Sequence, residues 1–374
     1  MKNAIFIAAT GQNVGKTTLC LGIIAALHKR FEQIGFIKPV GQQHVKVAED
    51  LKVDKDVVLF KEYFNLQSDY ADMSPVILPA GFTRDFLDRK IDGKAIEQSI
   101  KKAFHKIYDR HDYTIVEGTG HIGVGSIVHM NNAKVASLLG LEVVIIASGG
   151  LGSAHDELAL NIAMCQAYGV RVRGVILNRV LEDKKGMIEE YFPKALQHWG
   201  IPLIGCVPYN AFLNTPTLKD FEILFQTQLL AGEKHHYRHF QHHRLVAGSL
   251  QAYQDELHSN ELIITPASRE DIILATLQRH QMAKENQQDA LLGMILTSKH
   301  PPSPFILNLI KQADIPALYA PLCSYDAMKM ITSFTAKIRG EDLPKIEQAI
   351  QLVESNIDLD RLVCPLAQPH SISN

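Results

Sequence analysis

Gly15-Lys16-Thr17, a tripeptide near the start of the sequence, has the residue types that phosphate-binding loops use. It follows an apolar run over residues 4–9 and leads into a helix-like pattern from residue 16. A loop between a strand and a helix points backbone N–H groups and the positive end of the helix dipole at an anion. Lys16 would then reach the outer phosphates of a nucleotide, and the Thr17 hydroxyl would ligate Mg²⁺. The predicted nucleotide-binding residues of this loop are Gly11, Gln12, Asn13, Val14, Gly15, Lys16, Thr17 and Thr18.

Further polar residues stand where other predicted strands end. Glu117 closes the run "TIVE", and a carboxylate at a strand end can bind Mg²⁺ or orient water. Lys38 closes "GFIK" and can hold a γ-phosphate or an anionic substrate, although its position alone also fits a solvated lysine. Asn178 closes "GVILN", where its amide can bond to a purine edge, and Pro208 with Tyr209 would form the other wall of a base pocket. We predict catalytic roles for Lys16, Lys38 and Glu117.

Histidines suggest two weaker sites. His121 follows the Glu117 strand and can contact phosphate, transfer a proton or support the fold. A second group has spacings of three and four, which would place ring nitrogens on one face of a helix, as in some metal sites. Its members are His235, His236, His239, His242 and His243. Since no cysteine or clustered carboxylate accompanies them, we interpret this stretch as a solvated linker.

The elements that must position these residues alternate along the first part of the chain. Short β-branched runs at 4–9, 33–40, 113–118, 142–148, 172–180 and 202–210 are separated by helical segments. This alternation predicts right-handed βαβ units and a mostly parallel sheet. Ligands of such sheets bind at the carboxyl ends of the strands, where the residues above would converge. We therefore predict an α/β P-loop NTPase domain over residues 1–212.

The remainder predicts a smaller second α/β domain. Residues 213–258 are polar and rich in histidine, and we interpret them as a connecting segment. Residues 259–374 show strand-like runs alternating with helix patterns, and Ser268 with Asp271 has the spacing of a capping box. One helix face is predicted to hold Leu343, Ile346, Ile350 and Val353. The tail, residues 365–374, is expected to be frayed.

Composition limits the classes of protein that remain. The 374 residues are 46% hydrophobic and 21% charged with a net charge of −2, which argues against a binder of nucleic acid backbones. No apolar run reaches the roughly 18 residues that a membrane span needs, and we expect the N-terminal run to be a buried strand rather than a signal peptide. The five cysteines are scattered, which favours a reducing cytoplasm over a disulfide frame or a zinc cluster.

The order of the motifs carries a resemblance to a known family. T-G-x-x-V-G-K-T is followed by F-x-K-P-V, V-E-G-x-G, G-V-I-L-N-R and P-x-x-G-x-V-P-Y over residues 1–210. This order resembles the dethiobiotin synthetase family of P-loop ATPases, and more closely the dethiobiotin synthetase-like N-terminal region of long bacterial phosphotransacetylases. "SNELIITPASREDIILATL" resembles the start of the DRTGG domain that follows that region.

The resemblance implies ATP and Mg²⁺ as cofactors and supplies further site residues. In the family's loop register, Ala9 rather than Thr10 takes the place of the first glycine. The Mg²⁺-binding aspartate of the family matches Asp56, with Asp54 as the second choice, so the implied metal ligands are Thr17, Asp56 and Glu117. Lys38 matches the lysine that contacts the substrate carbamate. The family also implies a homodimer with substrate at the subunit interface.

This sequence departs from the family pattern at four points, which concern functions other than ATP binding. Gln12 and Asn13 replace the loop residues that help to hold the diamine substrate, and Gln42 stands near a position where the family has a small hydroxyl residue. Ser268 replaces an aspartate of the DRTGG domain. Because the sequence ends at Asn374, we expect no phosphotransacetylase catalytic domain. The ATP half of the site therefore matches the family, whereas the substrate half does not.

Three functions remain open at this point. The first is Mg²⁺–ATP hydrolysis or ligase-type chemistry on a small carboxylate or carbamate acceptor. The second is a nucleotide-binding regulatory or sensor protein that acts on a partner such as an acetyl-phosphate-metabolising enzyme. The third, ranked below these, is an amidotransferase-type synthetase related to cobyrinic acid diamide synthase. It requires a nucleophilic cysteine, and neither Cys323 nor Cys364 lies in a recognisable nucleophile motif.

Overall fold

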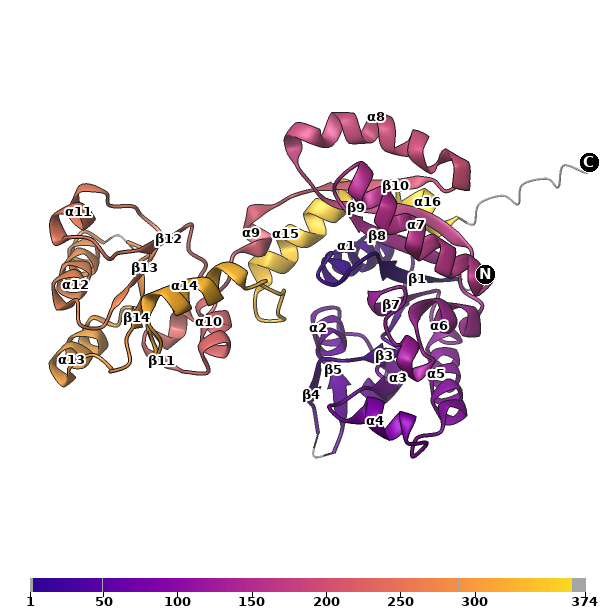
Figure 1. The fold of residues 1–374 in the computed structure, drawn as a ribbon, viewed down its shortest axis with the longest axis horizontal. Helices are drawn as coiled ribbons and strands as arrows, with labels where there is room; N and C mark the ends of the chain where they lie inside the picture. The colour runs from indigo at the N-terminus through magenta and orange to yellow at the C-terminus, as the bar shows by residue number, and fades with distance from the viewer. Residues whose placement is uncertain (1–2, 49, 288–289, 365–374) are drawn as a thin grey trace, which may run out of the picture. The chain divides into compact units, whose positions relative to one another are not determined.

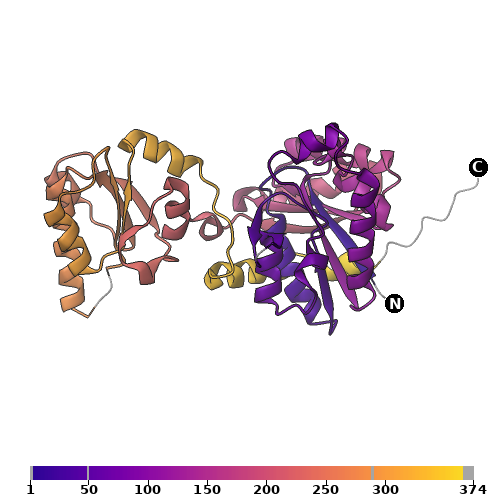
Figure 2. The ribbon, with the colours of Figure 1, turned by 90° about the horizontal axis from the view of Figure 1, so that it is seen from below.

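The protein forms two compact units, and one is inserted into the chain of the other. In this computed structural model, which describes residues 3–48, 50–287 and 290–364, unit 1 lies within Met1–Asn210 and Ile338–Asn374. Unit 2 consists of Ala211–Lys337. The colours of Figures 1 and 2 show the same arrangement, since the yellow C-terminal helices lie among the indigo and magenta elements of unit 1.

Unit 1 contains a six-stranded parallel sheet in the order β10-β9-β8-β1-β7-β2. The strands are β1 Asn3–Ala9, β2 Ile34–Ile37, β7 Tyr113–His121, β8 Val143–Ser148, β9 Val172–Val180 and β10 Leu203–Pro208. Most of their residues are buried because helices cover both faces, and this burial explains their nearly continuous apolar runs. The predicted α/β class and the mostly parallel sheet are confirmed.

Helices and two small sheets complete the N-terminal part of unit 1. The helices are α1 Lys16–His28, α2 Lys55–Tyr63, α3 Tyr70–Met73, α4 Phe82–Leu87, α5 Gly93–Tyr108, α6 Asn132–Leu139, α7 Gly152–Ala167 and α8 Lys185–Leu196. The short strands are β3 Val40–Gly41 with β6 Val76–Ile77, which pair in parallel, and β4 His44–Lys46 with β5 Lys52–Asp54, which form an antiparallel hairpin. The hairpin leads directly into α2 and so places Asp54 and Asp56 next to the sheet.

A C-terminal segment, residues 338–364, returns to unit 1 and covers α1. Its helices are α15 Leu343–Glu354 and α16 Leu359–Val363. α15 packs along α1, where Val353 lies over Gly22, and Lys29 binds Glu354 at 2.8 Å. The sequence predicted this segment as part of the second domain, and the structure differs because an amphipathic helix does not specify in its own sequence which surface it covers.

Unit 2 has its own five-stranded sheet in the order β11-β15-β14-β13-β12, with only β11 antiparallel to its neighbour. The strands are β11 Leu229–Ala231, β12 His242–Leu245, β13 Glu261–Pro266, β14 Gly293–Thr297 and β15 Ala317–Ala320. The helices are α9 Ala211–Asn214, α10 Leu218–Phe225, α11 Leu250–Asp255, α12 Glu270–Glu285, α13 Pro304–Ala313 and α14 Ser324–Ser333. The two edge strands come from the stretch predicted as a connecting segment. They escaped prediction because they are short and, in β12, largely exposed.

Some local predictions need correction. α12 has Arg269 as its N-cap and no side-chain cap, so the capping box predicted at Ser268 is wrong; the Arg269 guanidinium instead binds Asp271. On α15, Ile346 and Val353 are buried, whereas Leu343 is 51% exposed. The tail, residues 365–374, lies outside the described residues.

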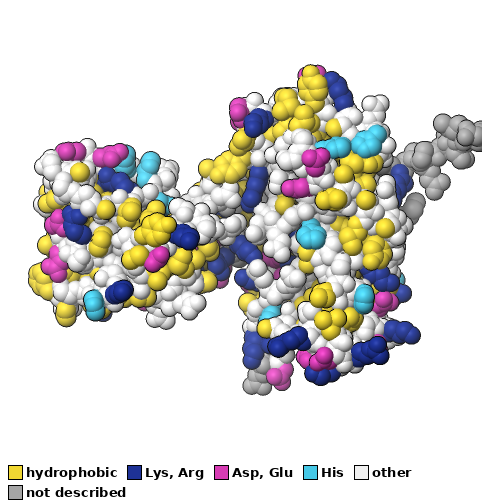
Figure 3. All heavy atoms as spheres, viewed as in Figure 1, with side chains coloured by type: hydrophobic (Ala, Val, Ile, Leu, Met, Phe, Trp, Pro, Cys, Tyr) yellow, Lys and Arg dark blue, Asp and Glu magenta, His cyan; other side chains and the backbone are white. Residues whose placement is uncertain are grey.

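Within the part of the chain that the structure describes, no helix has both the length and the apolar character needed to cross a bilayer. On the face drawn in Figure 3, charged side chains of both signs are interspersed with hydrophobic ones. This mixture agrees with the net charge of −2.

Candidate functional site

The loop between β1 and α1 has the geometry of an anion-binding turn. Gly15 is the N-cap of α1 with a left-handed φ of 102°, and Asn13 is also left-handed with a φ of 57°. Gly15 has no side chain that could cap α1, so no side-chain cap competes with an anion at the first turn of this helix. The N–H groups of that turn, together with the helix dipole, favour a phosphate at this position. Gln12 and Asn13 are exposed, Val14 is buried, and Thr18 is half-buried in the first turn.

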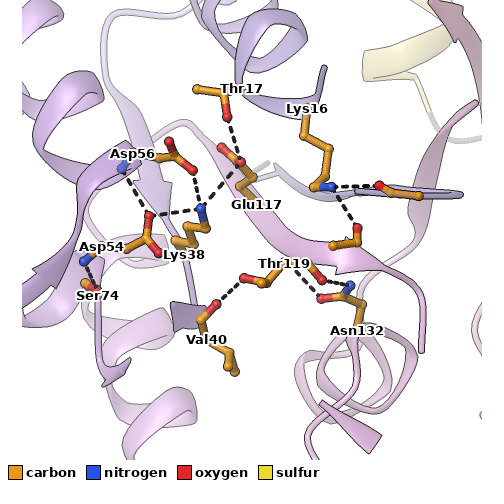
Figure 4. A network of polar contacts seen from close by, with 12 residues as sticks. Lys16, Thr17, Lys38, Val40, Asp54, Asp56, Ser74, Glu117, Thr119 and Asn132 are labelled. Atoms are coloured by element: carbon orange, nitrogen blue, oxygen red, sulfur yellow. Dashed lines mark hydrogen bonds and ion pairs between the residues drawn. The ribbon is translucent and has the colours of Figure 1, made fainter. Parts of the chain in front are cut away.

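Lys16 is held between this loop and the end of β7. Its ammonium group donates to the carbonyl of Gly120 at 2.7 Å and approaches the carbonyl of Gly11 at 3.5 Å (Figure 4). Burial lowers the pKa of Lys16, and the nearby Glu117 carboxylate opposes that shift. Two neutral carbonyls are weak partners for an ammonium group compared with an anion, so Lys16 is poised to exchange them for phosphate oxygens.

A second lysine lies within a group of three acids. The Lys38 ammonium binds Asp54 at 2.9 Å, makes a short contact with Asp56, and lies 3.8 Å from Glu117 (Figure 4). Burial alone would lower the pKa of Lys38, but the carboxylates of Asp56, Glu117 and Asp54 together raise it. Lys38 is therefore charged, and its ammonium group is the common counter-ion of this cluster. We call Lys38, Asp54, Asp56 and Glu117 the acid cluster.

Glu117 connects the acid cluster to the phosphate loop. Its Oε1 accepts a hydrogen bond from the Thr17 hydroxyl at 3.4 Å, so the end of β7 and the start of α1 meet at this carboxyl group. The side chain is 1% exposed, and burial raises the pKa of Glu117 to about 8. Asp54 is equally buried, and burial also raises the pKa of its carboxyl group.

The oxygen atoms present fit a magnesium ion. Buried Oδ2 of Asp54 and buried Oε2 of Glu117 have no hydrogen-bond partner, and the Thr17 hydroxyl lies beside Glu117. Oxygen ligands of this kind suit Mg²⁺, which keeps several waters and takes further oxygens from phosphate. Among the described residues no group of three or more His, Cys, Asp or Glu side chains could hold a metal by itself.

The histidine-rich stretch is not one helical face. His242 and His243 belong to β12, whereas His235 ends a 3₁₀ turn, so these residues share no helical face, and the stretch that we interpreted as a linker is part of unit 2. The His236 ring lies 3.3 Å from Glu222, and the His242 ring stacks on His258. Within unit 2 these side chains serve packing and polar contacts.

Asn178 contacts the backbone of the loop between β1 and α1. Its amide donates to the carbonyl of Val14 at 2.7 Å, and a Cβ atom added to Gly15 would meet the Asn178 nitrogen at 2.2 Å. Pro208 and Tyr209 lie farther along the sheet edge, at the end of β10, which β9 and β8 separate from β1. A purine-binding role for these three residues stays a prediction.

Several residues of the site had no recognisable sequence signal. Asn132 is buried at the start of α6; its amide donates to the carbonyls of Thr119 and His121, and its oxygen accepts from the N–H of Thr119. Ser74 accepts from the backbone N–H of Asp54 at 2.9 Å. These contacts fix the end of β7 and the start of α2. His121 is exposed, and its ring accepts from the N–H of Gly123 at 3.1 Å, so it lies at the edge of this region.

The matches to protein families agree with the division of the chain into two units. A family described as an AAA domain matches residues 3–217, and one described as a DRTGG domain matches residues 224–334. Among solved structures, the MinD cell division protein of Aquifex aeolicus aligns with 56% of this chain and 84% of its own, at 16% identity and a TM-score of 0.35. A TM-score this low does not support any assignment of function.

Curated relatives fall into two groups. The phosphate acetyltransferase of Nitrosomonas europaea is 26% identical over 386 residues, which cover 98% of this chain and 52% of that protein. The chain therefore spans about half the length of the phosphate acetyltransferases that it matches. The ATP-dependent dethiobiotin synthetase BioD of Brachyspira hyodysenteriae is 31% identical over 219 residues, which cover 55% of this chain and 92% of that protein. The chain thus belongs to the AAA domain family of P-loop proteins, in which its first domain is related to dethiobiotin synthetase and to phosphate acetyltransferase, and it also carries a DRTGG domain.

Proposed function

We propose that the protein binds Mg²⁺–ATP in unit 1 and uses it for ATPase or ligase-type chemistry on a small carboxylate or carbamate acceptor. The observation that carries this proposal is the convergence of Lys16, Thr17 and the acid cluster at one edge of the sheet. Kinship with ATP-dependent dethiobiotin synthetase supports ATP as the nucleotide. The exposed Gln12 and Asn13, which stand where that family meets its diamine, favour a different acceptor.

Each residue has a role that follows from its position. The loop N–H groups and Lys16 bind the β- and γ-phosphates, and Lys16 spreads the charge that develops during phosphoryl transfer. Thr17, Asp56 and Glu117 would hold Mg²⁺, which supplies electrophilic stabilisation of the phosphate oxygens. Lys38 lies beside this ion site and would face the γ-phosphate or the anionic acceptor. Asn178, Pro208 and Tyr209 would line the base pocket.

A second candidate is regulatory rather than catalytic. Unit 2, which carries the DRTGG domain, is inserted between two parts of unit 1, so both of its chain connections lead into the nucleotide-binding unit. Binding of nucleotide would then change the contacts of unit 2 and control a partner enzyme. The relatives named phosphate acetyltransferase make an enzyme of acetyl phosphate metabolism a reasonable partner.

A turnover measurement on the wild-type protein tests these candidates. Binding of Mg²⁺–ATP is measured by calorimetry, and release of ADP is followed with and without small carboxylates and amines. Release of ADP that increases with an acceptor is the result expected for the enzyme. Tight binding with negligible turnover supports the regulatory function, and absence of nucleotide binding contradicts both.

Replacing Gly15 by alanine is expected to weaken nucleotide binding by about tenfold or more, because the residue needs a left-handed φ of 102° and its new Cβ would press on the Asn178 amide. Titration with a fluorescent ATP analogue measures the effect. Gly152→Ala at the start of α7 is the matched control, since nothing lies within 4 Å of its added Cβ. Equal affinities of the two variants would show that the Gly15 conformation is not needed for binding.

A further inference from the structure

The Lys38 ammonium group lies among the carboxyl groups of the acid cluster, where the proposed function would place a divalent cation. Lys38 is 6% exposed and contacts Asp54, Asp56 and Glu117 through its terminal nitrogen. Two of these acids are the matched metal ligands of the proposed function, on which the present inference rests. The ammonium group therefore neutralises the same carboxyl groups that Mg²⁺ would need.

The Lys38 ammonium group and a metal ion cannot share the Asp56 oxygen that Lys38 contacts in the observed geometry. A Mg²⁺ ion lies about 2.1 Å from each oxygen ligand and requires near-octahedral surroundings. An ion bound to Oδ2 of Asp56 would lie against the Lys38 nitrogen, which contacts that same oxygen. Two positive centres at such a distance repel strongly in a buried site, where solvent screens little. Binding of the metal at this oxygen thus requires that Lys38 leave Asp56.

A nucleotide offers Lys38 another partner. The phosphate loop lies beside the acid cluster, since Thr17 of α1 bonds to Glu117 at 3.4 Å. A γ-phosphate bound at that loop brings negative charge that can attract the ammonium group away from Asp56. The carboxylate then becomes available to the ion that accompanies the phosphates.

We propose that Lys38 makes metal binding conditional on nucleotide: its ammonium group occupies the carboxylates of Asp54 and Asp56 in the nucleotide-free protein and excludes a divalent cation until phosphates draw it away. Lys38 is then a positioning residue for the ion as well as a neighbour of the acceptor. By thermodynamic reciprocity, a bound metal ion also strengthens nucleotide binding. Part of this effect arises because the metal has already displaced Lys38 from Asp56.

The test measures Mn²⁺ binding directly, without any turnover. The full chain is titrated with Mn²⁺ alone while the electron paramagnetic resonance signal of free Mn²⁺ is recorded, and the titration is repeated with a non-hydrolysable ATP analogue. The nucleotide-free wild-type protein is expected to bind Mn²⁺ weakly. Lys38→Met is expected to bind Mn²⁺ alone about tenfold or more tightly than the wild type does. Lys101→Met, on the exposed face of α5, serves as the control and should match the wild type.

Each outcome bears on the proposal. Equal Mn²⁺ affinities of folded Lys38→Met and wild type, or a tight Mn²⁺ site in the nucleotide-free wild type, would overturn it. The Mn²⁺ titration of the nucleotide-free wild type needs no variant, so it tests the proposal even if Lys38→Met fails to fold. Asp56→Asn in the Lys38→Met background should abolish the gained site. If the wild type does not bind the ATP analogue at all, the proposed function fails instead, and the two failures are thereby distinguished.

Discussion

Replacing Lys16 by alanine is expected to lower ATP turnover by about 100-fold or more, since removing one preorganised charge from a transition-state site has effects of this size. The Lys16 ammonium group now contacts two backbone carbonyls at the ends of the loop and of β7. Lys16 is the first residue of α1, whereas the Lys38 ammonium group is already paired with carboxylates of the acid cluster. Without the Lys16 ammonium group, the γ-phosphate would lose one of its positive counter-charges, while the loop N–H groups would still bind the other phosphates.

Binding and turnover should be measured separately for this variant. Calorimetry with Mg²⁺–ATP is expected to show weaker binding, and the rate of ADP release under saturating ATP should fall further than the affinity. Lys101→Ala on α5 removes an exposed lysine and provides the matched control. If Lys16→Ala retained both wild-type affinity and wild-type turnover, the assignment of this loop as the nucleotide site would be wrong.

Replacing Gly22 by alanine is expected to destabilise unit 1 by about 1–3 kcal/mol, the usual cost of overpacking a tight core. Glycine to alanine in the middle of a helix normally adds stability. In α1, however, an added Cβ would lie 2.3 Å from Cβ of Val353, which belongs to α15 at the other end of the chain. The two helices would have to separate, and the Lys29–Glu354 ion pair at their rim would be strained.

Gly186→Ala is the control for this prediction. Gly186 lies in α8, and nothing is within 4 Å of its added Cβ, so Gly186→Ala should stabilise the protein by about 0.5 kcal/mol. Unfolding of unit 1 can be followed by fluorescence, because the single tryptophan, Trp199, lies in that unit. A double variant with Val353→Gly should be less unstable than the sum of the single changes. Equal effects of the Gly22 and Gly186 substitutions would show that α15 does not pack on α1 as described.

The sequence alone was sufficient for the first sheet and the phosphate loop. Buried parallel strands need nearly continuous apolar residues, and this requirement made β1, β7, β8 and β9 readable with almost correct ends. The Gly15-Lys16-Thr17 loop is a local feature, since a strand, a turn and a helix start follow each other directly in the chain. Lys38 and Glu117 were predicted because residues at the carboxyl ends of parallel strands converge, whereas Asp56, which lies in α2, was implied only by the family resemblance.

The tertiary structure decided how distant segments are combined. No local pattern predicts that α15 covers α1 rather than the second sheet, that β11 and β12 form the edges of that sheet, or that Asn132 and Ser74 fix the ends of β7 and the start of α2. Likewise, the sequence predicted Lys38 beside the phosphate loop, whereas only the folded chain shows its ammonium group among three carboxyl groups. Periodicity and strand-end chemistry are properties of neighbouring residues and can be read from sequence. The choice of partner for a helix face, an edge strand or a buried charge depends on shape and electrostatics across the whole fold.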